Sequence, residues 1–165
     1  MKLQPITPNL WFDGNAEEAA NFYVSIFPNS RIVRKTKVPA ALSKEIGAKP
    51  GSVLMVEFEL NGQPFLGLNG GPAFKFNEAV SFMVHCKDQE EVDHYWKKLT
   101  AGGSEQPCGW AKDKFGLSWQ IDPAEWMEMV TSNDEEKVVR GMKAMLQMKK
   151  MDLAKLKAAY NGTAK

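Results

Sequence analysis

Two stretches decide the fold: NAEEAANFYVSI at residues 15–26 and DQEEVDHYWKKL at residues 88–99. Each opens with Asn or Asp and carries Glu three residues later, which is the pattern of a capping box at a helix N-terminus. Apolar residues then recur at i, i+3, i+4 and i+7, the spacing of one helix face. Matched residues lie 88 − 15 = 73 positions apart, so the pattern predicts two related helices in an internally duplicated chain. The matched apolar pairs are Ala19 and Val92, Phe22 and Tyr95, Tyr23 and Trp96, and Ile26 and Leu99.

Each predicted helix follows a short apolar strand and precedes further strand-like segments. The leading strands are expected at residues 6–12 and 80–86. The later strands are expected at residues 30–38, 52–60, 63–69, 105–112 and 117–122. Asn61-Gly62 is a strong hairpin signal, and residues 113–116 predict a second hairpin. Residues 39–51 are bounded by Pro and Gly and predict a loop with one helical turn.

These elements predict an α+β fold of two βαβββ modules followed by helices. The modules are expected at residues 1–73 and 74–131, and a C-terminal helical extension at residues 132–165. In the extension, Ser132 and Glu135 form a capping box for a helix that reaches about Lys149, and Asp152 caps a shorter one. The apolar face of the extension is rich in sulfur, which is typical of core or partner-helix packing rather than of a cofactor site. This face comprises Met142, Met145, Leu146 and Met148.

Composition excludes several classes of protein. The net charge of the 165 residues is +1, which argues against a nucleic-acid partner. No run approaches the roughly 20 apolar residues that a membrane span needs, so no membrane partner is expected. The first residues lack the apolar core of a signal peptide, so we expect a cytoplasmic protein. Cys86 and Cys108 form no CxxC pair and are expected to be free thiols.

Four stretches carry a resemblance to a known family. They are ITPNLWFDGNAEEAANFYVSIFPNSRI at residues 6–32, LNGGP at 68–72, CGWAKDKFGLSWQIDP at 108–123 and AMLQMKKMDLAKL at 144–156. Together they resemble the PhnB-like branch of the vicinal-oxygen-chelate superfamily, which includes glyoxalases, bleomycin-resistance proteins and extradiol dioxygenases. Members of this branch are often labelled 3-demethylubiquinone 3-methyltransferase-like. The resemblance implies paired βαβββ modules whose curved mixed sheets enclose a cavity, usually in a homodimer.

The resemblance also implies four positions at which metal-dependent relatives place ligands. They fall near Pro8, within residues 67–69, near Ala79 and at Gln120. None of these positions holds His, Glu, Asp or Cys, the residue types that bind divalent metals together. We therefore expect no family metal.

No cofactor is expected either. Methyl transfer from S-adenosylmethionine would call for a glycine-rich turn that leads into a helix N-terminus. Gly70-Gly71 leads into a proline, and Gly102-Gly103 ends a helix. A methyltransferase activity therefore has no motif to support it.

Two residues could carry catalysis without a metal. Cys108 lies near Lys112, whose charge could lower the pKa of the thiol and create a nucleophile. The alternative is that Cys108 is a small, half-buried apolar residue on a strand. His85 ends its strand on the same face as Ser81 and Met83 and could act as a general base near neutral pH. The alternative is a solvated histidine at a strand end.

Uncharged and aromatic side chains could also line a small-molecule pocket. Trp110 shares strand parity with Cys108 and Lys112, and Asn69, Ser118 and Gln120 would supply hydrogen-bonding groups. The expected ligand-binding set is Asn69, Ser81, Trp110, Lys112, Ser118 and Gln120.

Two classes of function remain open. One is a small-molecule-binding protein that has no metal and an unknown reaction. The other is a metal-independent enzyme that uses Cys108 or His85 on a small cytosolic substrate. The expected partners are an unknown small molecule and a second copy of the chain.

Overall fold

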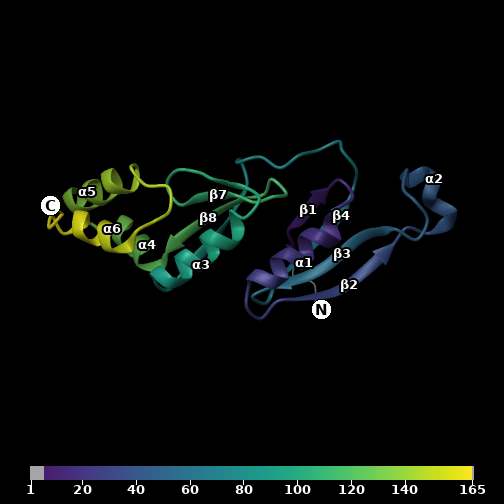
Figure 1. Ribbon diagram of the computed structural model, residues 1–165, viewed down its shortest axis with the longest axis horizontal. Helices are drawn as coiled ribbons and strands as arrows, with labels where there is room; N and C mark the ends of the chain where they lie inside the picture. The colour runs from purple at the N-terminus through teal and green to yellow at the C-terminus, as the bar shows by residue number, and fades with distance from the viewer. Residues whose placement is uncertain (1–5, 165) are drawn as a thin grey trace. The chain divides into compact units, whose positions relative to one another are not determined.

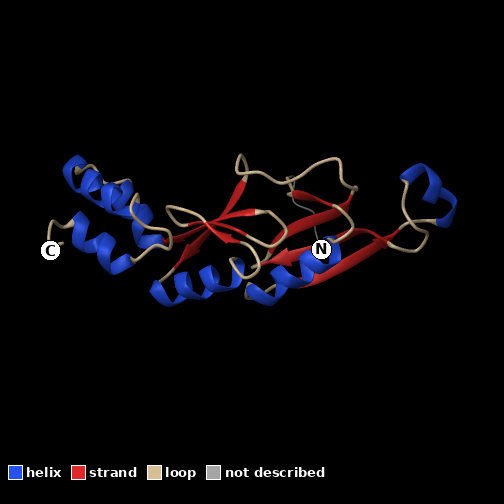
Figure 2. Cartoon of the chain, turned by 45° about the horizontal axis from the view of Figure 1, so that its top comes forward, coloured by secondary structure: helices blue, strands red, loops and turns tan. Residues whose placement is uncertain are grey.

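A computed structural model describes residues 6–164 and divides the chain into two compact units, Met1–Lys75 (unit 1) and Phe76–Lys165 (unit 2). Each unit contains a four-stranded mixed sheet and helices, which confirms the predicted α+β class (Figure 1). Both sheets are open, and the last part of the chain consists of helices (Figure 2). Between residues 6 and 164, no helix is long and apolar enough to cross a membrane.

Unit 1 is the first βαβββ arrangement, and its strands pair in the order β1-β4-β3-β2. Its elements are β1 (Asn9–Phe12), α1 (Ala16–Ile26), β2 (Arg31–Lys37), β3 (Val53–Leu60) and β4 (Gln63–Asn69). β1 and β4 are parallel and the other neighbours are antiparallel. Tyr23 of α1 stacks on Phe58 of β3, and Phe58 on Phe65, so the aromatic residues form the core under the helix. Between β2 and β3, a 3-10 turn and α2 (Ser43–Ile46) confirm the helical turn predicted within residues 39–51.

Unit 2 repeats this topology, with strands in the order β5-β8-β7-β6. Its sheet and covering helix are β5 (Ser81–Cys86), α3 (Gln89–Leu99), β6 (Ser104–Glu105), β7 (Trp110–Lys112) and β8 (Ser118–Pro123). Three helices follow, α4 (Ala124–Val130), α5 (Glu135–Met145) and α6 (Leu153–Tyr160). The predicted apolar stripe of α3 is buried, with Val92, Tyr95, Trp96 and Leu99 all below a tenth exposed.

The two module helices begin in different ways. In α3, Glu91 N–H donates to the Asp88 side chain at 2.9 Å, as predicted. In α1, Asn15 occupies the N-cap position as predicted, but its side chain makes no capping hydrogen bond. Instead Ala16 N–H donates to Oδ1 of Asn69 at 2.9 Å, and Nδ2 of Asn69 donates to the Val53 carbonyl at 2.9 Å. The end of β4 reaches the start of α1, so a side chain 53 residues away replaces the local cap.

Replacing Asn69 by alanine should therefore lower the free energy of unfolding more than replacing Asn15. The first change removes a helix cap and a strand tether together, at about 1–2 kcal/mol. The second change removes no side-chain cap. Urea unfolding of both variants checks this. Equal losses, or a larger loss for Asn15→Ala, would contradict the assigned cap.

The segment predicted as one strand at residues 105–112 is not one strand. β6 ends at Glu105 and β7 begins at Trp110, with a turn between them. Cys108 and Gly109 adopt positive φ values of 60° and 80° in this turn. Cys108 N–H donates to the Met148 carbonyl at 2.8 Å and Gly109 N–H to the Lys149 carbonyl at 2.7 Å. Pairing with the C-terminal segment thus interrupts the strand, a long-range contact that the local sequence does not reveal.

The hairpin predicted at residues 113–116 is confirmed, and a buried carboxylate organises it. Asp113 is 3% exposed. Its Oδ1 accepts from Phe115 N–H and Leu117 N–H, at 2.8 and 3.1 Å. Its Oδ2 accepts from the indole N–H of Trp119 at 2.9 Å. The carboxylate therefore joins the turn to the core of the sheet.

The C-terminal helices differ from the prediction at three points. Helix α4 was not predicted, and it buries Trp126. Helix α5 is capped by Asp134, which accepts from Lys137 N–H at 3.1 Å, rather than by Ser132, and it ends at Met145 rather than near Lys149. Asp152 caps α6 as predicted, accepting from Lys155 N–H at 3.0 Å.

The segment after α5, including α6, packs on its own unit. Met151 and Leu156 are fully buried. The Gln89 side chain accepts from Leu153 N–H at 2.8 Å and donates to the Met151 carbonyl at 3.1 Å. Much of the predicted Met-rich face stays outside, since Met142 and Leu146 are 41% and 60% exposed. The extension therefore stabilises unit 2 and still presents an apolar stripe.

Candidate functional site

The sheet of unit 2 has one face covered by α3, and we call the opposite face the open face. Met83 and His85 are exposed on the open face, whereas Ser118 and Asp122 are buried there. Strand pairing arranges the side chains of the open face in three rows, because residues opposite each other in a ladder point to the same side. The first row is Ser81, Ser118 and Lys112; the second is Met83, Gln120 and Trp110; the third is His85 and Asp122. The alternate residues Ala111, Trp119 and Ile121 are buried on the side of α3.

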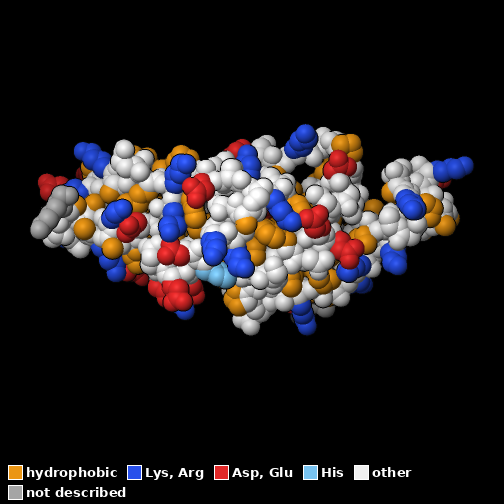
Figure 3. Space-filling view, viewed as in Figure 1, with side chains coloured by type: hydrophobic (Ala, Val, Ile, Leu, Met, Phe, Trp, Pro, Cys, Tyr) orange, Lys and Arg blue, Asp and Glu red, His pale blue; other side chains and the backbone are white. Residues whose placement is uncertain are grey.

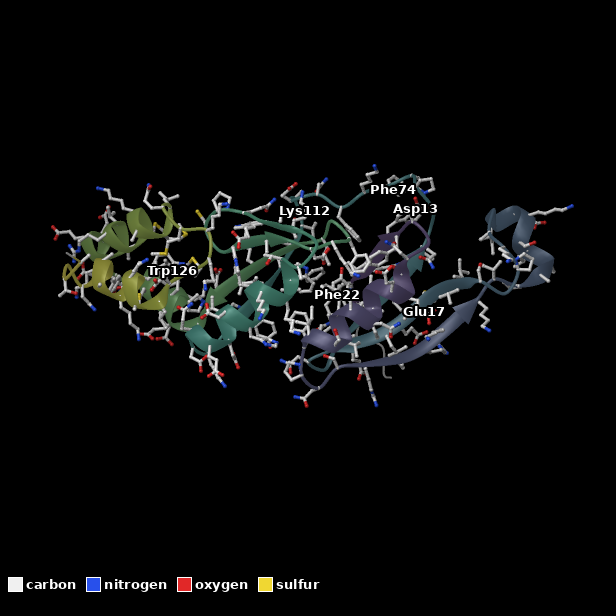
Figure 4. All side chains as sticks on the ribbon, in the orientation of Figure 1. Asp13, Glu17, Phe22, Phe74, Lys112 and Trp126 are labelled. Atoms are coloured by element: carbon white, nitrogen blue, oxygen red, sulfur yellow. The ribbon has the colours of Figure 1, made fainter. Side chains whose placement is uncertain are left out.

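The pairing thus brings six sequence-predicted residues to one face. They are Ser81, His85, Trp110, Lys112, Ser118 and Gln120. Nε2 of Gln120 donates to Oγ of Ser81 at 2.9 Å, which links the second row to the first. The Lys112 ammonium forms an ion pair with Glu78, from the turn before β5 (Figure 4 labels Lys112). Ser118 is fully buried, and its hydroxyl has no hydrogen-bond partner.

Asp122 completes the third row and was missed from the sequence. It is 6% exposed and lies opposite His85 in the parallel ladder. Burial raises the pKa of Asp122 to about 6, and the nearby charge of His85 acts in the opposite direction. The signal was present in the strand: Ser118, Gln120 and Asp122 alternate with two apolar residues. A carboxyl group with this pKa can hold or accept a proton near neutral pH.

Replacing Asp122 by asparagine should raise the free energy of unfolding at neutral pH by roughly 1–2 kcal/mol. The pKa is higher in the folded than in the unfolded chain, so the folded protein favours the protonated form. The associated stability is present below the unfolded pKa and is lost as the pH rises through about 6. The gain from Asp122→Asn should therefore shrink as the pH falls toward 4. Thermal unfolding of both proteins across pH 4 to 8 checks this, and a gain that grows in acid would contradict it.

The two cysteines differ in chemistry. Cys86 is fully buried, and burial raises the pKa of its thiol to about 12, so it stays protonated. Cys108 is half-buried in the turn between β6 and β7, not on a strand as one interpretation had it. The charge of Lys112, which was expected to activate the Cys108 thiol, is paired with Glu78.

Asn69 lies in unit 1, and both ends of its amide are engaged in holding α1 and β3. The glycine pair that follows it also has a structural explanation. A Cβ at Gly70 would lie 2.2 Å from the Trp11 ring, and the Trp11 indole N–H donates to the Gly71 carbonyl at 2.8 Å. The LNGGP stretch therefore positions Trp11 and the start of α1.

Unit 1 also contains a cleft of about 590 Å³ beside the start of α1. Two of its lining residues are Asp13 and Glu17, both labelled in Figure 4. Glu17 pairs with Lys35 at 2.5 Å, so its charge is already balanced. Across the molecule, acidic and basic side chains are interspersed on the face seen in Figure 3.

The side chains do not fit the divalent metal that the fold implies. Among residues 6–164, no three His, Cys, Asp or Glu side chains lie together in a way that could hold a metal ion. Gln120 lies on the open face, and its amide donates to Ser81. The open face offers hydroxyl, amide, imidazole, ammonium and carboxyl groups instead, which can bind and move protons.

The chain is similar to known proteins over most of its length. Residues 4–122 match the model of the family described as 3-demethylubiquinone-9 3-methyltransferase. A PhnB protein from Bacillus cereus, described by the same activity, is 36% identical, with a TM-score of 0.65, over 73% of this chain and 100% of that one.

More distant structures share the fold. Protein PA1353 from Pseudomonas aeruginosa is 18% identical, with a TM-score of 0.58, over 74% of this chain and 98% of that one. The fosfomycin resistance protein FosX from Listeria monocytogenes is 15% identical, with a TM-score of 0.53, over 80% of this chain and 100% of that one. No curated protein matches the chain.

Proposed function

This chain belongs to the family described as 3-demethylubiquinone-9 3-methyltransferase, a PhnB-like branch of the vicinal-oxygen-chelate superfamily, and on that premise we propose that it binds a small molecule on the open face of unit 2. The observation that carries the proposal is the second row. There an exposed Met83, the Gln120 amide and a half-buried Trp110 lie side by side. Apolar and aromatic groups with a few converging polar groups are typical of small-molecule sites.

A second candidate function is a proton-transferring enzyme that uses no metal. Asp122 and His85 favour it, because a buried carboxyl group with a pKa of about 6 lies opposite an imidazole on the same face. The sequence predicted His85 as the general base. Asp122 lies opposite His85 and has a raised pKa, so it can accept a proton as well. Methyl transfer is the activity in the family description, and no residue on the open face is specific to it.

We also propose that a second copy of the chain completes the site. Because helix α3 covers only one face of the sheet, a further module can pack against the other face and enclose it. The exposed stripe formed by Val139, Met142 and Leu146 on and after α5 supports such an assembly, because exposed apolar patches mark interfaces. Light scattering of the full-length protein tests this.

Amide chemical shifts of the labelled protein, recorded with a fragment library, test ligand binding. We expect shifts to gather on β5, β7 and β8 at the open-face residues. Trp110→Ala should abolish them, whereas Phe115→Ala, which changes a half-buried aromatic residue of the same hairpin, should not. Shifts that gather in the unit 1 cleft, or none with any fragment, would overturn the proposal.

A further inference from the structure

The first row of the open face contains a charged group that already holds a carboxylate. Lys112 lies in line with Ser118 and Ser81 across three strands. Its ammonium pairs with the Glu78 carboxylate, which also accepts from Nε2 of Gln106 at 3.4 Å. The hydrogen bond from the Lys112 ammonium holds the pKa of Glu78 below its usual value, so Glu78 is ionised at neutral pH. Lys112 on the open face therefore already binds one carboxylate, that of Glu78.

The Glu78 contact is well suited to being exchanged. Glu78 belongs to a turn of residues 78–79 outside any helix or strand, and its side chain is 50% exposed. Exposed ion pairs contribute little to stability, so moving Glu78 away from Lys112 costs little. Lys112 is fixed on β7, and its side chain is only 30% exposed. The basic partner is thus anchored while the acidic partner is free to leave.

Ser118 supplies an independent observation. It lies between Lys112 and Ser81 on the middle strand, fully buried, and its hydroxyl is unpartnered. A buried hydroxyl without a partner is unfavourable until an acceptor reaches it. A ligand oxygen bound at Lys112 would lie next to this hydroxyl and could accept its hydrogen.

We propose that the molecule bound on the open face carries a carboxylate, which displaces Glu78 from Lys112 and accepts a hydrogen bond from Ser118. The inference rests on the proposed function and specifies its ligand class. Two residues along a strand span about 7 Å, so the apolar part of such a ligand would reach Met83 and Trp110 in the second row. In the absence of ligand, the Glu78 carboxylate then occupies the position on Lys112 that the ligand carboxylate takes.

Titrations of the full chain with benzoate and with its neutral counterpart benzamide test the proposal, followed by amide chemical shifts. Benzoate should bind at least about tenfold more tightly than benzamide. Glu78→Gln should tighten benzoate binding by about fivefold, because it removes the competing carboxylate. Lys112→Met should weaken benzoate by about tenfold and leave benzamide unchanged, and Ser118→Ala should weaken benzoate by about threefold. Glu90→Gln, an exposed change at the start of α3, is the matched control and should change nothing.

Several outcomes would overturn the proposal. They are equal affinity for benzoate and benzamide, benzoate affinity that Glu78→Gln leaves unchanged, and an absence of shifts with benzoate, phenylacetate and hexanoate alike. Circular dichroism of each variant separates a lost contact from a lost fold. In one possible result, neutral fragments change the amide shifts of the open-face residues while carboxylates bind no more tightly than they do. That result would contradict the carboxylate ligand class and leave the proposed binding function standing. If no compound shifts the open face, both fall.

Discussion

Replacing Asp113 by alanine should lower the free energy of unfolding of unit 2 by about 3–4 kcal/mol. The carboxylate accepts three hydrogen bonds, from two backbone N–H groups and the Trp119 indole. Its loss leaves these donors without their acceptor, and Leu117 and Trp119 are both nearly inaccessible to water. Urea unfolding followed by tryptophan fluorescence measures the change. Four of the five tryptophans, all except Trp11, lie in unit 2.

Two variants make this result specific. Asp113→Asn keeps one oxygen for the turn and should retain part of the stability. Asp13→Ala removes an exposed carboxylate and should change the free energy of unfolding by less than about 0.5 kcal/mol. An Asp113→Ala protein that unfolds at the wild-type urea concentration would show that the carboxylate is not what joins the turn to the sheet.

Removing residues 134–165 should prevent unit 2 from folding stably. The deletion takes away Met151 and Leu156, which are fully buried, and uncovers Trp126. It also removes the carbonyls of Met148 and Lys149, which accept from Cys108 and Gly109. Since truncating one buried Leu or Met to alanine costs about 2–5 kcal/mol, losing both exceeds what a small domain can spare. The shortened protein should aggregate or lose its near-ultraviolet circular dichroism.

Point changes on the exposed stripe separate folding from assembly. Met142→Glu and Leu146→Glu alter residues that are 41% and 60% exposed, so the fold should survive them. If the stripe is a dimer interface, light scattering will show the double variant as a monomer, and its near-ultraviolet circular dichroism will be unchanged. A deleted protein that stays folded and monomeric, with normal near-ultraviolet dichroism, would contradict the role assigned to the C-terminal segment.

Much of the site could be predicted from strand alternation. Because side chains alternate across a strand, parity alone places Ser118 and Gln120 on one face and Trp119 on the other. The same rule would have placed Asp122 had the strand been followed to its end. Parity failed for Cys108, because it holds only while the backbone stays extended, and a turn with positive φ intervenes.

The duplicated helices show the limit of counting along the chain. A shift of 73 places the buried Tyr23 on the buried Trp96. The last inward-facing residues of the two leading strands, Phe12 and Cys86, are 86 − 12 = 74 apart. The connection between the leading strand and its helix is therefore one residue shorter in unit 2 than in unit 1. The spacing of apolar residues within the helices does not reveal such a difference, because it lies outside the helices.

The sequence by itself determined the α+β class, the two module helices, the second hairpin and the caps at Asp88 and Asp152. Each of these depends on contacts between residues a few positions apart, where spacing and side-chain type are sufficient. Only the tertiary structure decided the cap of α1 by Asn69 and the turn at Cys108. The same holds for the pairing of Lys112 with Glu78 and the raised pKa of Asp122. These features arise between segments distant in the chain, or from burial by the assembled unit, because a hydrogen bond or a desolvated charge exists only once folding has brought its surroundings together.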